Sequence, residues 1–382
     1  MIYLDNAATT CVAKEVQDTI IKNLNVYGNP SSSYSIGKES KQLLNNSRHV
    51  IEDCLNLPRN SFIFTSGGSE ADNIAIKAGF MHGLMRGRKK IVISSVEHHA
   101  ISHAAEQMKV FGAIVEYVKV NNKGEIDIDD LQNKIDINTA IVSIMTSNNE
   151  TGSIMNIYAA ADLAHKFGAL FHTDAVQGIT HMSIAASMVD MYSISGHKFH
   201  VPKGIGGLYI EPHLQEDLKQ LSLISGGKQE FGLRAGTENI PYAIGLSVGV
   251  AMIVDNMHFK VKHLETLHDY AIQQLTDAFP YIKINGTTNT KQKNPSIINA
   301  SFGFADAASI VEWANLFDIC ISSGSACNTG SNKPSHVLTA MGCNEKEAFS
   351  SIRISMSESN SKNDIDQLIN ALKMFESRYK IS

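Results

Sequence analysis

Short apolar runs alternate with stretches of helical periodicity through much of the chain. Strands are predicted at 62–66, 90–96, 114–119, 140–146, 169–173, 190–194 and 206–210. Helices are predicted between them at 37–55, 69–86, 99–111 and 156–168. This alternation indicates an α/β fold with a mostly parallel sheet and helices on both faces. The last strand follows its predecessor too closely for a helical crossover, which favours antiparallel pairing there.

Length, charge and cysteine usage extend this picture. A chain of 382 residues exceeds what one hydrophobic core usually serves, so we expect two domains. The net charge of -5 gives no indication of a positively charged surface that would bind nucleic acid.

Because the sequence has no unbroken run of 18 apolar residues, we expect no membrane span. Asp5 stands where a signal peptide would need its apolar core, so a cytoplasmic location is expected. Five cysteines (11, 54, 320, 327 and 343) form no C-x-x-C pair, which predicts free thiols.

The turn after strand 190–194 carries the most informative residue, Lys198. It follows Ser195, Gly196 and His197 and precedes a glycine-rich return at 202–207. A lysine that forms a Schiff base needs a lowered pKa and space for a flat ring, and small neighbours leave that space. An ordinary surface-turn lysine is the alternative that this segment leaves open.

Two other strand ends carry candidate chemistry. Asp174 closes a buried strand, where an aspartate can pair with a pyridinium nitrogen; a helix N-cap is the alternative. Strand 62–66 runs into Gly67 and Gly68, then Ser69 as a predicted N-cap with Asp72 three residues on. A helix N-terminus in that setting can bind phosphate, and a plain strand-to-helix connection is the alternative.

Cys327 lies in a polar loop of small residues, so we interpret it as a candidate nucleophile rather than a buried hydrophobic residue. His98, His99 and His103 gather at a predicted helix start. They could bind zinc, but the H-E-x-x-H spacing is lacking, and no metal site is predicted.

Ordered motifs along nearly the whole chain resemble those of the NifS/IscS-type cysteine desulfurases, which are fold-type I, pyridoxal-phosphate-dependent enzymes of the class V aminotransferase family. The motifs lie at 3–10, 28–32, 65–73, 97–98, 148–152, 172–177, 195–198, 234–239, 322–327 and 351–353. The loop at 322–327 is similar to that of the long-loop members. The resemblance implies a large cofactor-binding domain at 14–255. It also implies a small α+β domain at 256–382, completed by residues 1–13.

The resemblance also implies roles for the matched residues. Lys198 would carry pyridoxal 5'-phosphate and act as general acid and base, and His98 would stack on its ring. Asp174 would pair with the ring nitrogen and Gln177 with the ring oxygen. The implied phosphate contacts are Gly68, Ser69, Ser195, His197 and, from the second subunit of a homodimer, Thr237. The implied contacts of the substrate carboxylate are Asn149 and Arg353.

The reaction implied is removal of sulfur from L-cysteine, which gives L-alanine and a persulfide on Cys327. The sulfur would pass to acceptor proteins of iron–sulfur cluster assembly or of tRNA or cofactor thiolation. A selenocysteine lyase or an aminotransferase of the same superfamily is the alternative, although transamination needs no thiol. A scaffold that binds partners without turnover is a third interpretation, which the complete set of Lys198, Asp174, His98, Cys327 and Arg353 disfavours. The chain departs from the family at 226–232 and at 200–201, where His-Val replaces the common Tyr-Gly.

Overall fold

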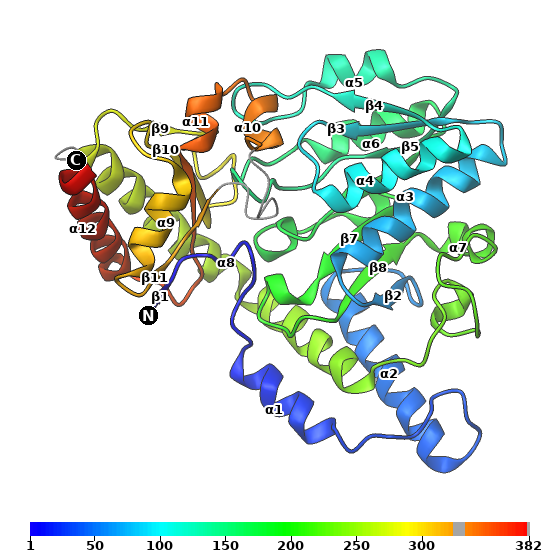
Figure 1. Cartoon of the computed structure of the whole chain (residues 1–382). Helices are drawn as coiled ribbons and strands as arrows, with labels where there is room; N and C mark the ends of the chain where they lie inside the picture. The colour runs from blue at the N-terminus through cyan, green and yellow to red at the C-terminus, as the bar shows by residue number, and fades with distance from the viewer. Residues whose placement is uncertain (324–332, 380–382) are drawn as a thin grey trace.

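The larger part of the chain is built on a seven-stranded sheet (Figure 1). The computed structural model describes residues 1–323 and 333–379. Across the sheet the order is β2 (Phe62–Thr65), β8 (Gly206–Ile210), β7 (Met191–Ser195), β6 (Leu170–Asp174), β5 (Thr139–Ser143), β3 (Lys90–Ser94) and β4 (Ile114–Val118). β8 pairs antiparallel with β2 and β7, and the other pairings are parallel. The predicted α/β class, the seven strands and the antiparallel pairing of 206–210 are confirmed.

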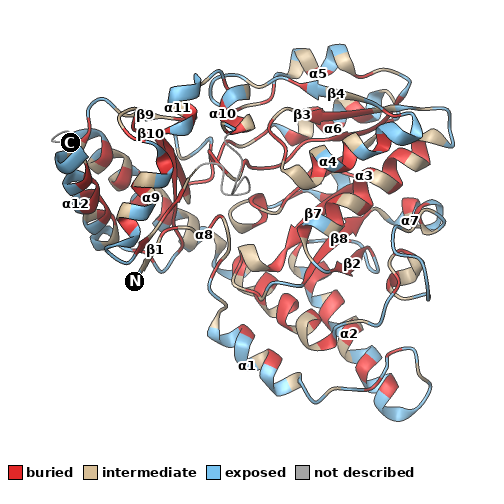
Figure 2. Ribbon diagram, viewed as in Figure 1, coloured by how far each residue is buried: buried red, intermediate tan, exposed pale blue. Residues whose placement is uncertain are grey.

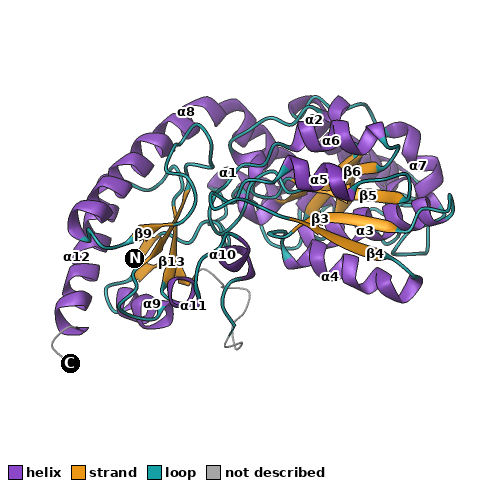
Figure 3. Ribbon diagram, turned by 90° about the horizontal axis from the view of Figure 1, so that it is seen from above, coloured by secondary structure: helices purple, strands orange, loops and turns teal. Residues whose placement is uncertain are grey.

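Helices cover both faces of this sheet, and Figure 3 shows the two layers from above. One face packs on α3 (Gly68–Leu84), α4 (His99–Gln107) and α7 (Pro212–Lys219). The other face packs on α2 (Ser35–Cys54), α5 (Ile128–Lys134) and α6 (Ile157–Lys166). Every residue of β2, β5, β7 and β8 is buried, as Figure 2 shows in red. Strands covered on both faces need apolar residues on both, which explains their continuous apolar runs.

A second core lies to the left in Figure 1, around a four-stranded antiparallel sheet. Its strands are β12 (Ser322–Ser323), β13 (Ser351–Ser355), β10 (Ile297–Ser301) and β9 (Lys283–Ile284). β1 (Ile2–Tyr3) pairs in parallel with β11 (Ile319–Cys320), so the N-terminus joins this part of the fold. The helices of this core are α9 (Ala307–Asn315) and α12 (Lys362–Tyr379). α10 (His336–Ala340) and α11 (Glu345–Phe349) instead contribute Val337, Leu338 and Ala348 to the core of the larger part.

The helix α8 (Ile240–Ala278) connects the two cores. Its first half buries Leu246 and Val250 in the larger core, and its second half buries Leu267 and Leu275 in the smaller one. It also packs on α1 (Lys14–Asn23) and α2. The predicted domain boundary at 255/256 falls inside α8 and stays a prediction. By length and composition alone, α8 is the one helix of the described residues that could cross a membrane. Its burial in two cores accounts for that apolar composition.

Candidate active site

A cavity of about 530 Å³ opens where the carboxyl ends of β6 and β7 meet the N-terminus of α3. The N-terminal segment and β13 close it from the side of the smaller core. Ligands collect at this edge of open α/β sheets. Ten of the predicted site residues line the cavity: Gly68, Ser69, His98, Asn149, Asp174, Gln177, Ser195, His197, Lys198 and Arg353.

Lys198 ends a single helical turn, Gly196–Lys198, directly after β7. The turn is tight: a Cβ on Gly196 would lie 3.0 Å from Val201 Cβ. The Lys198 Nζ donates hydrogen bonds to the carbonyl oxygens of Ala7, at 2.7 Å, and Ala8, at 2.9 Å. The N-terminal segment therefore crosses the cavity and fixes the direction of the lysine side chain.

Asp174 is the last residue of β6 and is buried. Burial raises its pKa to about 6, although the Val176 N–H and the charge of Lys198 oppose the rise. Its Oδ1 accepts the Val176 N–H at 2.9 Å, a local turn contact rather than a helix cap. Asp72, buried on α3, has its pKa raised well above the ordinary value, by burial and by the charge of Asp174. The two carboxyls cannot both be charged at low cost, so a cation facing Asp174 would be stabilised.

The N-terminus of α3 faces the cavity without a side-chain cap. The helix begins at Gly68 with Gly67 as N-cap, at φ +153°, so the prediction of Ser69 as N-cap is wrong. Ser69 lies in the first turn, and Asp72 is buried rather than part of a capping box. A Cβ on Gly68 would lie 2.8 Å from Val176 Cγ2, which leaves no room for a larger residue. The open backbone N–H groups and the helix dipole favour an anion here.

His98 is the N-cap of α4, and its Nδ1 accepts the Ala100 N–H at 3.1 Å. Burial, followed by the charge of Lys198, lowers its pKa to about 4. The ring is therefore neutral near pH 7 and carries its hydrogen on Nε2. His99 stacks at 4.7 Å on His103 and lies 4.8 Å from His336 between ring centroids. Within residues 1–323 and 333–379, no three His, Cys, Asp or Glu side chains are placed to hold a metal ion.

Arg353 enters the cavity from β13. Its Nη1 donates to the Asn149 carbonyl at 2.9 Å, and its Nη2 donates to Asp5 Oδ1 at 2.8 Å. The Nε is buried without a hydrogen-bond partner in the described part of the chain. Glu150 is buried nearby, and burial raises its pKa to about 7, against the hydrogen bond from Ser335 and the charge of Arg353. On the β13 side of the cavity, the Arg353 guanidinium is therefore the positively charged group beside Glu150.

Sequence reasoning missed most of the contribution of the N-terminal segment. Gln177 Nε2 donates to the same Ala7 carbonyl as Lys198, at 2.9 Å. His197 Nδ1 lies 3.2 Å from Thr9 Oγ1. The motif at 3–10 could have indicated that this segment has a role in the site. That it crosses the cavity follows only from the three-dimensional fold. Thr237 is exposed and does not line the cavity of a single chain. Cys327 lies outside the described residues.

Comparisons with known proteins agree with this geometry. The Aminotransferase class-V family model matches residues 2–368. The chain belongs to the class-V aminotransferase family. The chain is 36% identical to "Cysteine desulfurase IscS" of Clostridium botulinum over 385 residues, which covers 100% of this chain and 96% of that protein. It is similar to the solved structure of a NifS-like protein, with a TM-score of 0.89, 29% identity and coverage of 98% and 99%. SspA, solved in complex with cysteine, has a TM-score of 0.80 and 30% identity, with coverage of 94% and 100%.

In this member of the class-V aminotransferase family, buried contacts hold the segment 226–232, whose sequence departs from the family motif. Glu230 accepts two hydrogen bonds from Arg48, at 2.7 and 2.9 Å, and both side chains are buried. The Arg48 guanidinium also lies 4.8 Å from the Phe231 ring centroid. Glu230 and Phe231 have left-handed backbone, with φ of 44° and 59°. The altered segment therefore has a defined conformation of its own.

Proposed function

We propose that this protein is a pyridoxal-phosphate-dependent cysteine desulfurase. The single observation that supports the proposal best is one cavity that combines Lys198, Asp174 and Arg353 with an open helix N-terminus. The names and titles of its relatives, among them a cysteine desulfurase and a protein solved with cysteine, support the same substrate.

The residues present fit the cofactor. The α3 N-terminus at Gly68 and Ser69 would hold the phosphate together with Ser195 and His197. Asp174 would face the ring nitrogen, and the neutral His98 would lie against the ring. Lys198 would hold the aldehyde carbon covalently. When bound, pyridoxal phosphate supplies an electron sink for the bond broken at the substrate Cα.

The protein side chains would then do the positioning and the proton transfer. Arg353 would exchange its ion pair with Asp5 for the substrate carboxylate, because a guanidinium suits a carboxylate fork. Asn149, whose carbonyl already orients Arg353, would add a side-chain contact. Lys198 Nζ, once released from its link, would move the proton at the substrate Cα.

On the basis of its sequence motif, Cys327 would accept the sulfur atom. Its thiolate would attack the substrate sulfur, so that an S–S bond forms as the substrate Cβ–S bond breaks. The Cβ takes up a proton, and the balance is cysteine plus enzyme thiol to alanine plus enzyme persulfide. Acceptor proteins, such as an iron–sulfur scaffold or a tRNA-thiolation enzyme, would remove that sulfur.

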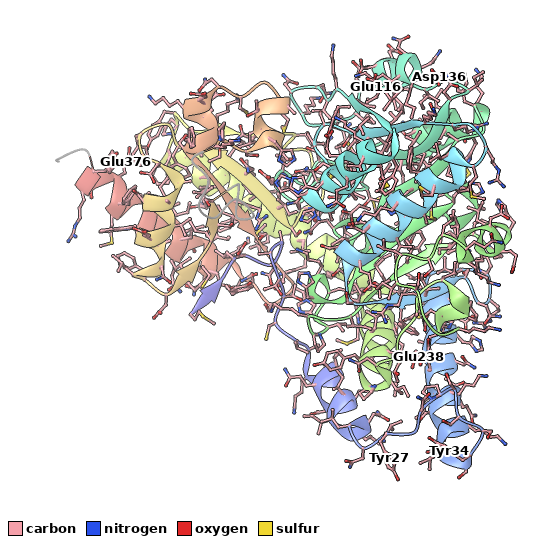
Figure 4. The ribbon with its side chains drawn as sticks, turned by 45° about the vertical axis from the view of Figure 1, so that its right-hand side comes forward. Tyr27, Tyr34, Glu116, Asp136, Glu238 and Glu376 are labelled. Carbon is pink, nitrogen blue, oxygen red and sulfur yellow. The ribbon has the colours of Figure 1, made fainter. Side chains whose placement is uncertain are left out.

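We also propose a homodimer. Apolar side chains are exposed along the end of α1 and the loop to α2: Ile21, Leu24, Tyr27 and Tyr34. Figure 4 places Tyr27 and Tyr34 at the same end of the molecule as Glu238, the neighbour of Thr237. A second subunit that covers this end would give Thr237 a route to the partner's cavity. A cytoplasmic location stays a prediction.

Borohydride reduction followed by peptide mapping tests the cofactor assignment, because Lys198 and Lys203 both line the cavity. We expect the cofactor label on Lys198, and Lys203→Ala should retain it. A label on Lys203 would show that the assignment is wrong.

A further inference from the structure

His200, two residues after Lys198, has a backbone that few residues adopt. Its φ is +66°, in the left-handed region. Both backbone groups bind the N-terminal segment: the N–H donates to Thr10 Oγ1 at 2.7 Å, and the carbonyl accepts the Ala13 N–H at 2.9 Å. The turn that carries Lys198 is therefore held in place through His200.

The ring of His200 joins two other parts of the fold. Its Nδ1 lies 2.9 Å from the Cys11 carbonyl, and its Nε2 lies 3.2 Å from Glu358 Oε1. Glu358 Oε2 in turn lies 3.0 Å from the Nζ of Lys260 on α8. These side chains border a cavity of about 330 Å³ that is lined by Phe199, His200, Lys260, His263 and Glu358, among others. We call this series of side-chain contacts, His200–Glu358–Lys260, the rear clamp.

Both contacts of the ring are to groups that only accept hydrogen bonds, a backbone carbonyl and an ionised carboxylate. The ring therefore lies between acceptors from two different segments, the N-terminal segment and the segment that follows β13.

The rear clamp connects the two residues on which the proposed reaction depends. Glu358 follows β13, the strand that carries Arg353, by three residues. The same segment is tied to the N-terminus, because Asn360 Nδ2 donates to the Tyr3 carbonyl at 3.1 Å. Lys198 and Arg353 come from different cores, so their spacing depends on contacts of this kind.

We propose that His200 is a positioning residue: its ring fastens the Lys198 turn to the Arg353 segment through Glu358, and so sets the site for the substrate carboxylate. This inference rests on the proposed function. A displacement of Arg353 relative to Lys198 weakens substrate binding before it affects the chemistry at the lysine.

The test compares His200→Asn and Glu358→Gln with a matched control. Asparagine tolerates the left-handed backbone, so His200→Asn removes the ring contacts and keeps the turn. His213→Asn removes another histidine–glutamate pair, which His213 makes with Glu211 at the N-terminus of α7. We expect KM for L-cysteine to rise about tenfold in both clamp variants, with kcat within about twofold of wild type. The double variant should add little to either single one. Unchanged KM values, or full additivity, would overturn the proposal.

A further readout needs no turnover. The Thr10 N–H donates to the His197 carbonyl at 2.8 Å, and the Ala13 N–H donates to His200. In the cofactor-free protein, hydrogen exchange of a peptide covering 5–13 should be about tenfold faster in His200→Asn than in wild type or His213→Asn. Equal exchange would overturn the clamp. If wild type fails to consume cysteine, the proposed function fails, while this exchange test still decides the clamp.

Discussion

Lys293 offers a stability prediction that the structure makes quantitative. The side chain is 1% exposed, and within the described residues its Nζ has no hydrogen-bond partner. It packs beneath the turn that carries Asn149: its Cε lies 3.2 Å from where a Cβ on Gly152 would be. Burial lowers the pKa of Lys293 from 10.5 to about 7. The amine thus lies buried behind the turn that carries Asn149.

The size of the effect follows from that pKa. The unfolded chain takes up the lysine proton near pH 10.5, whereas the folded protein takes it up only near pH 7. Between these values the unfolded state binds more protons, so stability falls as pH decreases from 10.5 to 7 and is then constant. At ~1.4 kcal/mol per pKa unit, the full cost below pH 7 is about 5 kcal/mol.

Lys293→Met removes this cost and keeps the length of the side chain. Equilibrium urea unfolding should show a gain of about 4–5 kcal/mol at pH 7 that shrinks to about 1 kcal/mol at pH 9.5. Lys291→Met is the matched control, since its side chain is 76% exposed beside Glu265, and it should change stability by less than about 0.5 kcal/mol. A gain that is equal at both pH values, or no gain, would refute the reasoning.

Three further predictions concern the site and its supports. Arg353→Ala should lower kcat/KM for cysteine by about 30- to 1000-fold (~2–4 kcal/mol), mainly through KM, while the cofactor absorbance persists; normal cysteine binding would make Arg353 structural. Arg48→Met should cost about 3–5 kcal/mol of unfolding free energy because it leaves Glu230 buried and unpaired. Arg86→Met, which removes an ion pair with Asp217 whose two side chains are both 49% exposed, should cost under about 1 kcal/mol, and similar losses would contradict this. In the cofactor-free protein, His98 should titrate near pH 4 by NMR, and a midpoint near 6.5 would contradict a ring removed from solvent.

Much of the larger domain could be predicted because its strands are short apolar runs separated by helical stretches. The pattern of apolar residues did not predict elements that pack in two cores or that pair with distant segments. α8 passes from one core to another, so its apolar face changes along its length and no single periodicity marks it. The very short strands β1, β11 and β12 are defined by partners far away in sequence, which local patterns do not show.

The site could be predicted residue by residue but not as a set of contacts. Asp174 and Lys198 could be placed at one edge of the sheet because both follow predicted strands. In open α/β sheets, ligand sites lie at the carboxyl ends of strands, and this rule depends on topology alone. The pairing of Arg353 with Asp5, separated by 348 residues, follows from the fold as a whole. The N-cap of α3 was misplaced because serine is a common cap, whereas here Gly67, with its positive φ, takes that position.

The most direct test of the central claim is the product of L-cysteine turnover by the pyridoxal-phosphate-loaded protein. We expect alanine to form in amounts equal to the sulfur released, with a protein persulfide that mass spectrometry places on Cys327. Cys327→Ala should retain the cofactor, release little alanine and carry no persulfide. Pyruvate in place of alanine, or a fully active Cys327→Ala protein with its extra sulfur on Cys320 or Cys343, would contradict the account.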